Sequence, residues 1–234
     1  MIIGSGLIAR AFEMDYLNTN EVVIFASGVS NSQCSDTKEY ERENMMIKDA
    51  LTQYEHAKFV YFSTTSIFDE DLQESPYVKH KCNIENFLLT HPTSSRVLIL
   101  RLPIVAGVTS NKHTLLNFLF DRITSGKEFK VFAKAFRNIL GIDDIVKICN
   151  ILINSNDLRG RAVNVCNPKS IKLTDLVLLI EAIVSKKAIF SLVNTGGGQA
   201  QIDMSEIEPF VQLSGVEFGQ DYIFDTLKKY YSPK

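Results

Sequence analysis

The stretch from Phe59 to Glu85 constrains the fold of this chain most, because it predicts a buried strand that leads into a helix. The strand is a short apolar run that ends in the hydroxyl residues Ser63-Thr64-Thr65-Ser66. Ser75-Pro76 then has the pattern of a helix start. Tyr77 and Lys81 are four residues apart, so they share one face of that helix and can meet the hydroxyls at the end of the strand.

A phenol, an ammonium and a hydroxyl that converge on one point can transfer a proton to or from an alcohol oxygen. A tyrosine, with an ordinary pKa of about 10, is a poor base at neutral pH, but a nearby cation stabilises the phenolate and lowers that pKa. A hydroxyl can then hold the substrate oxygen in line with the phenol. The alternative is a chance spacing, in which Tyr77 packs in the core and Lys81 faces solvent.

The bulk properties are those of an ordinary globular protein. The chain has 234 residues and a formal net charge of −2, which gives no electrostatic argument for binding nucleic acid or an anionic membrane. The most hydrophobic helical segment, from Leu173 to Val184, is interrupted by Asp175 and Glu181 and does not predict a membrane span. The cysteines and histidines show no metal-binding spacing, so we expect reduced thiols, no metal site and a cytoplasmic protein.

The N-terminus has the pattern of a phosphate cradle. Met1-Ile2-Ile3 predicts a strand, Gly4-Ser5-Gly6 a turn, and the segment from Leu7 to Leu17 a helix. Glycines let the backbone approach a pyrophosphate, and a helix N-terminus offers free amides to it. The alternative is a tight structural turn.

The second predicted strand, Val22 to Ala26, ends without the residue that a dinucleotide fold normally places there. Such folds have an acidic residue for the adenosine ribose, or a basic one for a 2′-phosphate. Here Ser27-Gly28 follows, and the first acidic residue after the strand is Asp36.

Short apolar strands alternate with helices along the rest of the chain, which predicts an α/β fold with a parallel sheet and helices on both faces. We expect a Rossmann-like domain over residues 1–168, with residues 103–135 contributing to a small substrate-binding lobe formed by residues 169–234. The later elements are predicted as helices and strands over these segments: 36–54, 77–90, 97–102, 115–123, 129–132, 162–165, 176–184 and 224–231. Asp143-Asp144 and Thr174 are expected to cap helices, and Gly196-Gly197-Gly198 to form a loop.

Several motifs resemble those of the extended short-chain dehydrogenase/reductase family, in its NAD-dependent epimerase/dehydratase branch. The segment from Ser75 to Lys81, with Glu85, is similar to the family's Ser-Pro-Tyr-x-x-x-Lys helix, and Phe62–Phe68 is similar to its catalytic strand end. Arg101–Gly107 is similar to the family's Arg-x-Pro-Asn-x-x-Gly turn, and Phe136–Asp144 to its Arg-Asp-Phe-Ile-x-Val-Asp-Asp run.

The resemblance implies a set of site residues. The implied catalytic residues are Tyr77, Lys81 and Thr64, with Thr65 as second choice for the hydroxyl. The implied cofactor is NAD or NADP, bound by Gly4, Ser5, Gly6, Leu7, Ile8, Ala26, Ser27, Gly28, Ser63, Tyr77, Lys81, Leu102 and Pro103. The implied substrate contacts are Thr65, Ser66, Ile104 and Arg137. Arg137 would grip the substrate diphosphate, or it is simply a surface charge.

The chain also departs from the family pattern. Ile3, Gly6 and Ala9 stand where the family has three glycines, and Ile104 replaces an asparagine that usually touches substrate. The strand ending in Ala26-Ser27-Gly28 aligns best with the family's fourth strand. The family's second and third strands are then missing, the first half of the fold is shortened, and the usual adenosine-ribose contacts are lost.

Two functions follow from the resemblance. The first is an NAD(P)-dependent oxidoreductase that reduces or epimerises a nucleotide-linked sugar, in the metabolism that feeds polysaccharide biosynthesis, and that forms a homodimer through the helices predicted at 36–54 and 77–90. A 4,6-dehydratase fits less well, because the resembling enzymes carry Asp-Glu where this chain has Thr65-Ser66. The alternative is a non-catalytic relative that binds a nucleotide, a sugar ligand or a protein partner.

Overall fold

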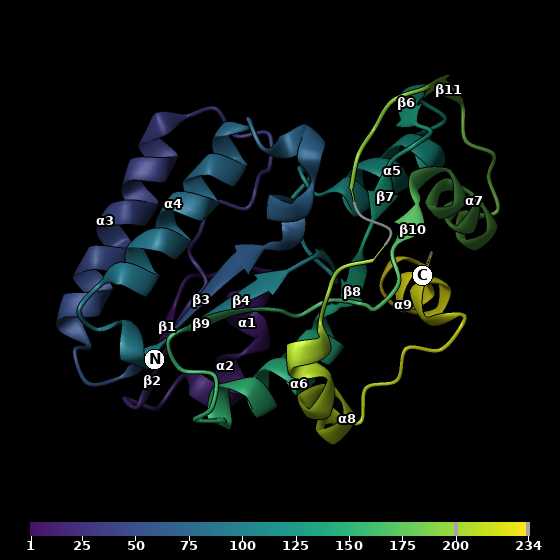
Figure 1. Ribbon diagram of the computed structural model, residues 1–234. Helices are drawn as coiled ribbons and strands as arrows, with labels where there is room; N and C mark the ends of the chain where they lie inside the picture. Colours follow the sequence, from purple (N-terminus) through teal and green to yellow (C-terminus); the bar gives the residue numbers. More distant parts are fainter. Residues whose placement is uncertain (199–200, 233–234) are drawn as a thin grey trace.

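The computed structural model describes residues 1–198 and 201–232, and it confirms the α/β fold with a parallel central sheet (Figure 1). Five strands pair in the order β1-β2-β3-β4-β9, and every neighbouring pair is parallel. These strands are β1 (Ile2–Ile3), β2 (Val22–Phe25), β3 (Lys58–Thr64), β4 (Val97–Leu102) and β9 (Arg161–Asn164). Parallel strands need crossover connections, which the intervening helices supply.

Helices cover both faces of this sheet, as predicted. Alternate side chains of a strand point to opposite faces, so Phe59 and Tyr61 of β3 pack in one cluster and Val60 and Phe62 in another. The first cluster lies under α3 (Thr37–Gln53) and α4 (Pro76–Thr90), which stand together at the left of Figure 1. The helices that contribute side chains to the second cluster are α1 (Leu7–Ala11), α2 (Glu13–Tyr16), α6 (Ile142–Asn154) and α8 (Glu208–Ser214).

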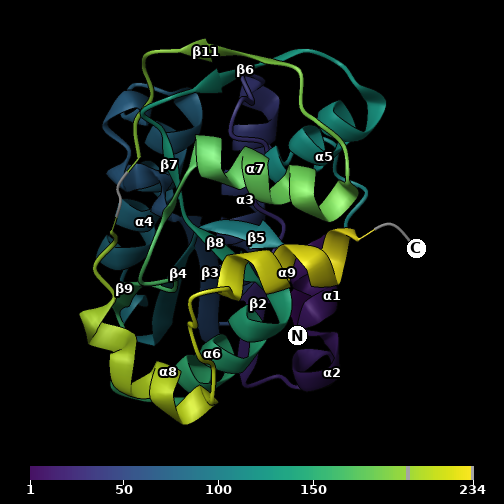
Figure 2. The same cartoon turned by 90° about the vertical axis from the view of Figure 1, so that its right-hand side faces the viewer.

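A smaller lobe lies beyond the ends of the strands, at the right of Figure 1 and toward the viewer in Figure 2. Its helices are α5 (Leu115–Ser125), α7 (Leu173–Val184) and α9 (Tyr222–Tyr231), which share one apolar cluster. Its short strands pair as β6 (Phe129–Phe132) with β11 (Phe190–Val193), β7 (Phe136–Arg137) with β10 (Ile171–Lys172), and β5 (Ile104–Ala106) with β8 (Ile139–Gly141).

The C-terminal segment packs on both parts of the molecule. Leu227 of α9 is buried in the lobe cluster, whereas Ile207, Val211 and Val216 are buried with the sheet and α6. The division of the chain at residue 168 therefore stays a prediction.

The structure corrects three local predictions. The helix expected from Leu7 to Leu17 is broken at Phe12, which is fully buried and packs on Phe62 with ring centroids 5.5 Å apart. Asp143 and Asp144 do not cap α6, because the helix begins at Ile142 and both carboxylates lie in its first turn. Thr174 does not cap α7 either, since β10 leads directly into a helix that begins at Leu173.

The remaining predicted elements, including the lobe strand β6, match within a few residues, while the lobe strands β5, β7, β8, β10 and β11 and the helix α8 escaped prediction. Gly196–Gly198 lies outside the helices and strands, as expected. Among the residues that the structure describes, no helix is both long enough and apolar enough to span a membrane.

Candidate active site

The candidate site lies where the strands of the sheet end, which is where ligands bind in open α/β sheets. Strand β1 ends before Gly4, β2 before Ala26, β3 at Thr64 and β4 at Leu102. The register pairs Ile3 with Phe25 and Thr64 with Leu102, so these ends meet at one edge of the sheet.

Tyr77 and Thr64 come together at the end of β3. The Ser75 hydroxyl caps α4 by accepting a hydrogen bond from the Val78 N–H at 3.2 Å, with Pro76 in the first turn. This start places the Tyr77 phenol near the Thr64 hydroxyl. Burial raises the pKa of Tyr77 to about 12, the Thr64 hydroxyl opposes this shift, and the nearby Glu43 charge adds to it. The pKa of Tyr77 therefore lies above its ordinary value, and not below it as we expected for a phenol beside a lysine.

Lys81 lies one turn further along α4 and is almost completely buried. Its ammonium donates to Glu43 Oε1 at 2.9 Å and to the Tyr61 hydroxyl at 2.8 Å, and it lies 5.9 Å from the centre of the Tyr77 ring. Burial lowers the pKa of Lys81, while the Glu43 carboxylate opposes that shift. The alternative in which Lys81 faces solvent is therefore wrong.

Glu43, from α3, is the centre of this buried polar network. Besides Lys81, its carboxylate accepts hydrogen bonds from the Tyr61 hydroxyl at 2.7 Å and the Val29 N–H at 2.7 Å, and its Oε2 lies 2.9 Å from His80 Nε2. Burial alone would raise the pKa of Glu43, but the His80 hydrogen bond, the Lys81 charge and the other donors lower it to about 2.

The backbone of Gly28 lies directly against the Lys81–Glu43 pair. A Cβ atom built on Gly28 would lie 2.7 Å from Lys81 Nζ and 2.8 Å from Glu43 Oε1, both too close for a side chain. A side chain at residue 28 would therefore have to displace the ends of the Lys81 and Glu43 side chains from their positions in the pair.

The predicted cofactor cradle is a tight turn with open space in front of it. Gly4 has φ +132°, which favours glycine, and a Cβ there would lie 2.4 Å from the Ala26 carbonyl oxygen. A Cβ on Gly6 would meet nothing within 4 Å, so the turn leaves room for a phosphate group. Ser5 is exposed, and its carbonyl oxygen accepts a hydrogen bond from Arg10 at 2.7 Å. The backbone at Gly6 is thus accessible to a group such as the pyrophosphate of a dinucleotide.

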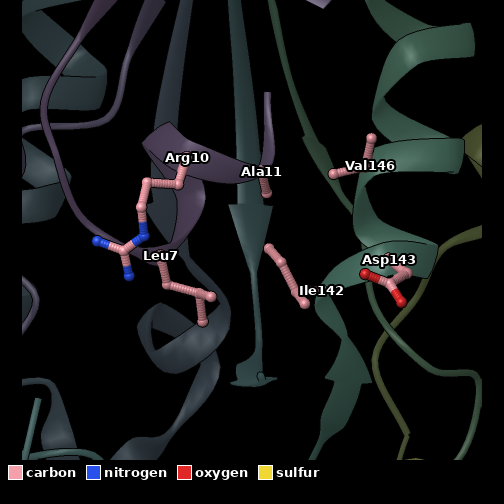
Figure 3. A pocket seen from close by; sticks show the side chains of 6 residues that line it. All are labelled: Leu7, Arg10, Ala11, Ile142, Asp143 and Val146. Atoms are coloured by element: carbon pink, nitrogen blue, oxygen red, sulfur yellow. The ribbon is translucent and has the colours of Figure 1, made fainter. Parts of the chain in front are cut away.

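A groove of about 350 Å³ runs beside this turn, between α1 and α6 (Figure 3). The residues that line it are Leu7, Arg10, Ala11, Ile142, Asp143 and Val146. Tyr77, Lys81 and Thr64 are not among them, so the groove adjoins the predicted cradle but not the catalytic candidates.

The other predicted cofactor residues differ in how free their side chains are. Ile8 and Ala26 pack against the apolar cluster of the sheet, and Leu102 is buried in it. The Ser27 hydroxyl and carbonyl both accept hydrogen bonds from Arg42 at 3.1 Å. Pro103 follows β4 and is partly exposed. The Ser63 hydroxyl donates a hydrogen bond to the buried carboxylate of Glu85.

The predicted substrate residues do not form one cluster of free polar groups. Thr65 is buried and Ser66 is half-buried in the short helix η1 (Thr65–Phe68) that follows β3. Ile104 is half-buried in β5 and packs with the lobe cluster.

Arg137, the fourth predicted substrate residue, is three-quarters enclosed rather than a free surface charge. Its Nη1 donates to the Phe136 carbonyl at 2.6 Å and to the Gly197 carbonyl at 3.0 Å, and it lies 3.7 Å from Asp69 Oδ2. Burial lowers the pKa of Arg137, while the Asp69 and Asp71 carboxylates oppose that shift.

The sequence contained a signal for Glu43 that our predictions did not use. Glu43 shares the buried face of α3 with Ile47, Ala50 and Leu51, at the spacing of one helical stripe. A carboxylate on an apolar stripe needs a buried partner, and Lys81 is that partner. A second buried carboxylate, Glu85, pairs with Arg101 at 2.6 Å, and Arg101 also lies over the Phe68 ring.

Comparison with known proteins identifies the fold of the chain. No protein-family model matches the sequence, and no curated protein matches it significantly. Among solved structures, the UDP-glucuronic acid 4-epimerase of Bacillus cereus, in complex with UDP-glucuronic acid and NAD, matches with a TM-score of 0.69 and 21% identity, over 92% of this chain and 80% of that one. RMD from Pseudomonas aeruginosa, complexed with NADPH, matches with a TM-score of 0.73 and 14% identity, over 97% of each chain.

A dTDP-glucose 4,6-dehydratase from Bacillus anthracis, in complex with NAD, also matches, with a TM-score of 0.66 and 14% identity, over 89% of this chain and 72% of that one. The chain therefore has the Rossmann-type fold of the NAD-dependent epimerase/dehydratase enzymes, as its motifs predicted.

Proposed function

We propose that this protein is an NAD(P)-dependent oxidoreductase that reduces or epimerises a nucleotide-linked sugar. The observation that supports it most is the buried convergence of the Tyr77 phenol and the Thr64 hydroxyl, with the Lys81 ammonium one helical turn away. Proteins of the same fold are described with NAD or NADPH and with a nucleotide sugar. The open turn at Gly6 fits such a cofactor.

In this proposal the cofactor supplies hydride transfer, and the residues of the chain move and hold protons. Tyr77 gives a proton to the carbinol oxygen or takes one from it, and Thr64 holds that oxygen in line with the phenol. The positive charge of Lys81 would stabilise the Tyr77 phenolate and so offset part of the rise in pKa that burial causes. The turn from Gly4 to Ile8, with Ser27 and Gly28, would hold the cofactor.

A second candidate function is supported by how the cationic groups are used. The Lys81 ammonium donates to Glu43 and Tyr61, and Arg137 donates to backbone carbonyls beside Asp69. Cations that are already satisfied suit a non-catalytic relative that binds a nucleotide, a sugar or a protein. The oxidoreductase remains our first proposal, because packing alone does not require a phenol, a hydroxyl and an ammonium to be buried together at the edge of the sheet where ligands bind.

Cofactor binding separates the two functions. We expect NADH or NADPH to bind the purified protein saturably, which nicotinamide fluorescence measures directly. A folded protein that binds neither would favour the non-catalytic relative. With a cofactor identified, keto-sugar nucleotides are the substrates to screen.

Tyr77→Phe tests the catalytic assignment. The variant keeps the packing but loses the proton donor, so turnover should fall by roughly 10²–10⁴-fold. Tyr16→Phe is the matched control, because Tyr16 is also buried but lies on the opposite face of the sheet, next to Phe12. A Tyr77→Phe enzyme as active as Tyr16→Phe would exclude Tyr77 as the acid or base.

The remaining parts of the proposal are the oligomeric state of the protein, its location and its metabolic role. A homodimer through α3 and α4, a cytoplasmic location and a role in polysaccharide biosynthesis are expectations from the resemblance. Light scattering that detects only monomers would remove the dimer.

A further inference from the structure

Glu43 is a fully buried carboxylate whose hydrogen-bond partners come from three separate segments of the chain. Its hydrogen-bond partners come from the segment after β2 (Val29 N–H), from β3 (Tyr61) and from α4 (His80 and Lys81). The Tyr40 ring, one turn earlier on α3, stacks on the His80 imidazole with centroids 4.4 Å apart. Four partners fix the carboxylate in one position, which is more than an ion pair alone requires.

We propose that Glu43 is a positioning residue that keeps Lys81 as a charged ammonium beside Tyr77. The proposal deepens the function proposed above and rests on it for its consequence in catalysis. A lysine this deeply buried would shed its proton at neutral pH without a compensating charge. Glu43 supplies that charge at 2.9 Å, and Tyr61 bridges the two groups by donating to Glu43 and accepting from Lys81.

The other charged and titratable groups around Lys81 do not replace this role. Glu85 favours the ammonium but is itself paired with Arg101, and Arg42 disfavours it. The titratable groups that face the network, by element, are Tyr40, Arg42 and Glu43 on α3, Tyr61 on β3, and Tyr77, His80, Lys81 and Glu85 on α4. Glu43 is the carboxylate in hydrogen-bond contact with Lys81.

Stability measured against pH tests the proposal without any cofactor. In Glu43→Gln the folded-state pKa of Lys81 should fall further below its unfolded value of about 10.4. The unfolded chain then binds more protons than the folded one between these two pKa values, so stability rises with pH across that window. We expect the melting temperature of Glu43→Gln to rise from about pH 7 upward, and the additional change Lys81→Met to abolish that rise.

Two matched variants separate charge from packing. Glu43→Asp keeps the negative charge. The pH at which its melting temperature begins to rise should therefore be the same as in the wild type, even if the variant is less stable at every pH. Glu181→Gln removes a carboxylate of the lobe that binds Lys187 and the Ala188 N–H, and should leave the rise of the melting temperature above pH 7 unchanged. A melting temperature of Glu43→Gln that is lowered equally at every pH, with no part sensitive to Lys81→Met, would overturn the proposal.

The experiment remains decisive if Glu43→Gln is poorly folded. Loss of one partner of a buried pair should lower the melting temperature by roughly 6–20 °C, whereas loss of both partners should cost less. Recovery of folding in the double variant Glu43→Gln/Lys81→Met would support the proposal, because the unpaired ammonium is then the cause. A double variant that is no more stable than Glu43→Gln would overturn it.

Cofactor titration then connects Glu43 to the proposed function. If the wild type binds NADH or NADPH, Glu43→Gln should lose affinity as the pH rises, at the same pH at which its stability increases. A pH-independent affinity in this variant would overturn the role of the Lys81 charge in the site. A wild type that binds neither cofactor would refute the proposed function, while the stability measurements would still decide whether Glu43 holds Lys81 charged.

Discussion

Replacing Gly28 by alanine should destabilise the protein through a steric conflict at the Lys81–Glu43 pair. The added methyl would lie 2.7 Å from Lys81 Nζ and 2.8 Å from Glu43 Oε1, whereas ordinary contacts begin at 3.4 Å. Both polar atoms must move away by several tenths of an ångström, and both are held by hydrogen bonds of 2.7–2.9 Å. Overpacking of this kind costs about 1–3 kcal/mol.

A thermal melt of the purified variant measures this cost. At about 2–4 °C per kcal/mol for a chain of this size, we expect the melting temperature to fall by roughly 2–12 °C. Gly219→Ala is the matched control, because a Cβ there meets nothing within 4 Å. A Gly28→Ala protein as stable as Gly219→Ala would refute the argument, since the backbone of residue 28 could not then lie over the ion pair.

Two further predictions concern acid stability and the C-terminal segment. The pKa of Glu43 is lowered to about 2 in the folded state, so the stability that this carboxylate contributes above about pH 4.5 should be lost as the pH falls toward 2. In urea melts over this range the wild type should therefore lose roughly 3 kcal/mol more than Glu43→Gln. Ile207→Ala should cost about 2–5 kcal/mol, because Ile207 is fully buried against the sheet domain; a loss under about 0.5 kcal/mol, within the range of a surface substitution, would place it outside the core.

The main sheet could be predicted from the sequence because its strands are buried on both faces. A strand such as Phe59-Val60-Tyr61-Phe62 is apolar at every position, and the segments between the strands carry clear helix starts such as Ser75-Pro76. The lobe strands β5, β7, β8, β10 and β11 escaped prediction because each has only two to four residues. Pairs as short as β7 with β10 are fixed by packing against helices rather than by their own sequence pattern.

The site was predictable at its catalytic candidates and not in its supporting network. The Tyr77–Lys81 spacing is local in sequence, so a helix alone brings these side chains to one face. Glu43 lies 38 positions before Lys81, and their contact depends on two helices crossing the same face of the sheet. The local spacing therefore predicts Tyr77 and Lys81 as site residues, whereas it gives no sign of the distant Glu43 that binds Lys81.

The position of β1 at the edge of the sheet bears on the choice between NAD and NADP. In the described part of the chain, β1 pairs only with β2, so no strand beyond β1 ends in an acidic residue for the adenosine ribose. Asp36, the first acid after β2, uses its carboxylate to cap α3 by accepting from the Lys38 N–H at 2.9 Å, and Arg10 is bonded to the Ser5 carbonyl. With Asp36 engaged in its cap and the Arg10 side chain held at the Ser5 carbonyl, NADH and NADPH should bind with dissociation constants within about tenfold of each other. A stronger preference for NADPH that disappears in Arg10→Met would show instead that Arg10 leaves Ser5 to bind the 2′-phosphate.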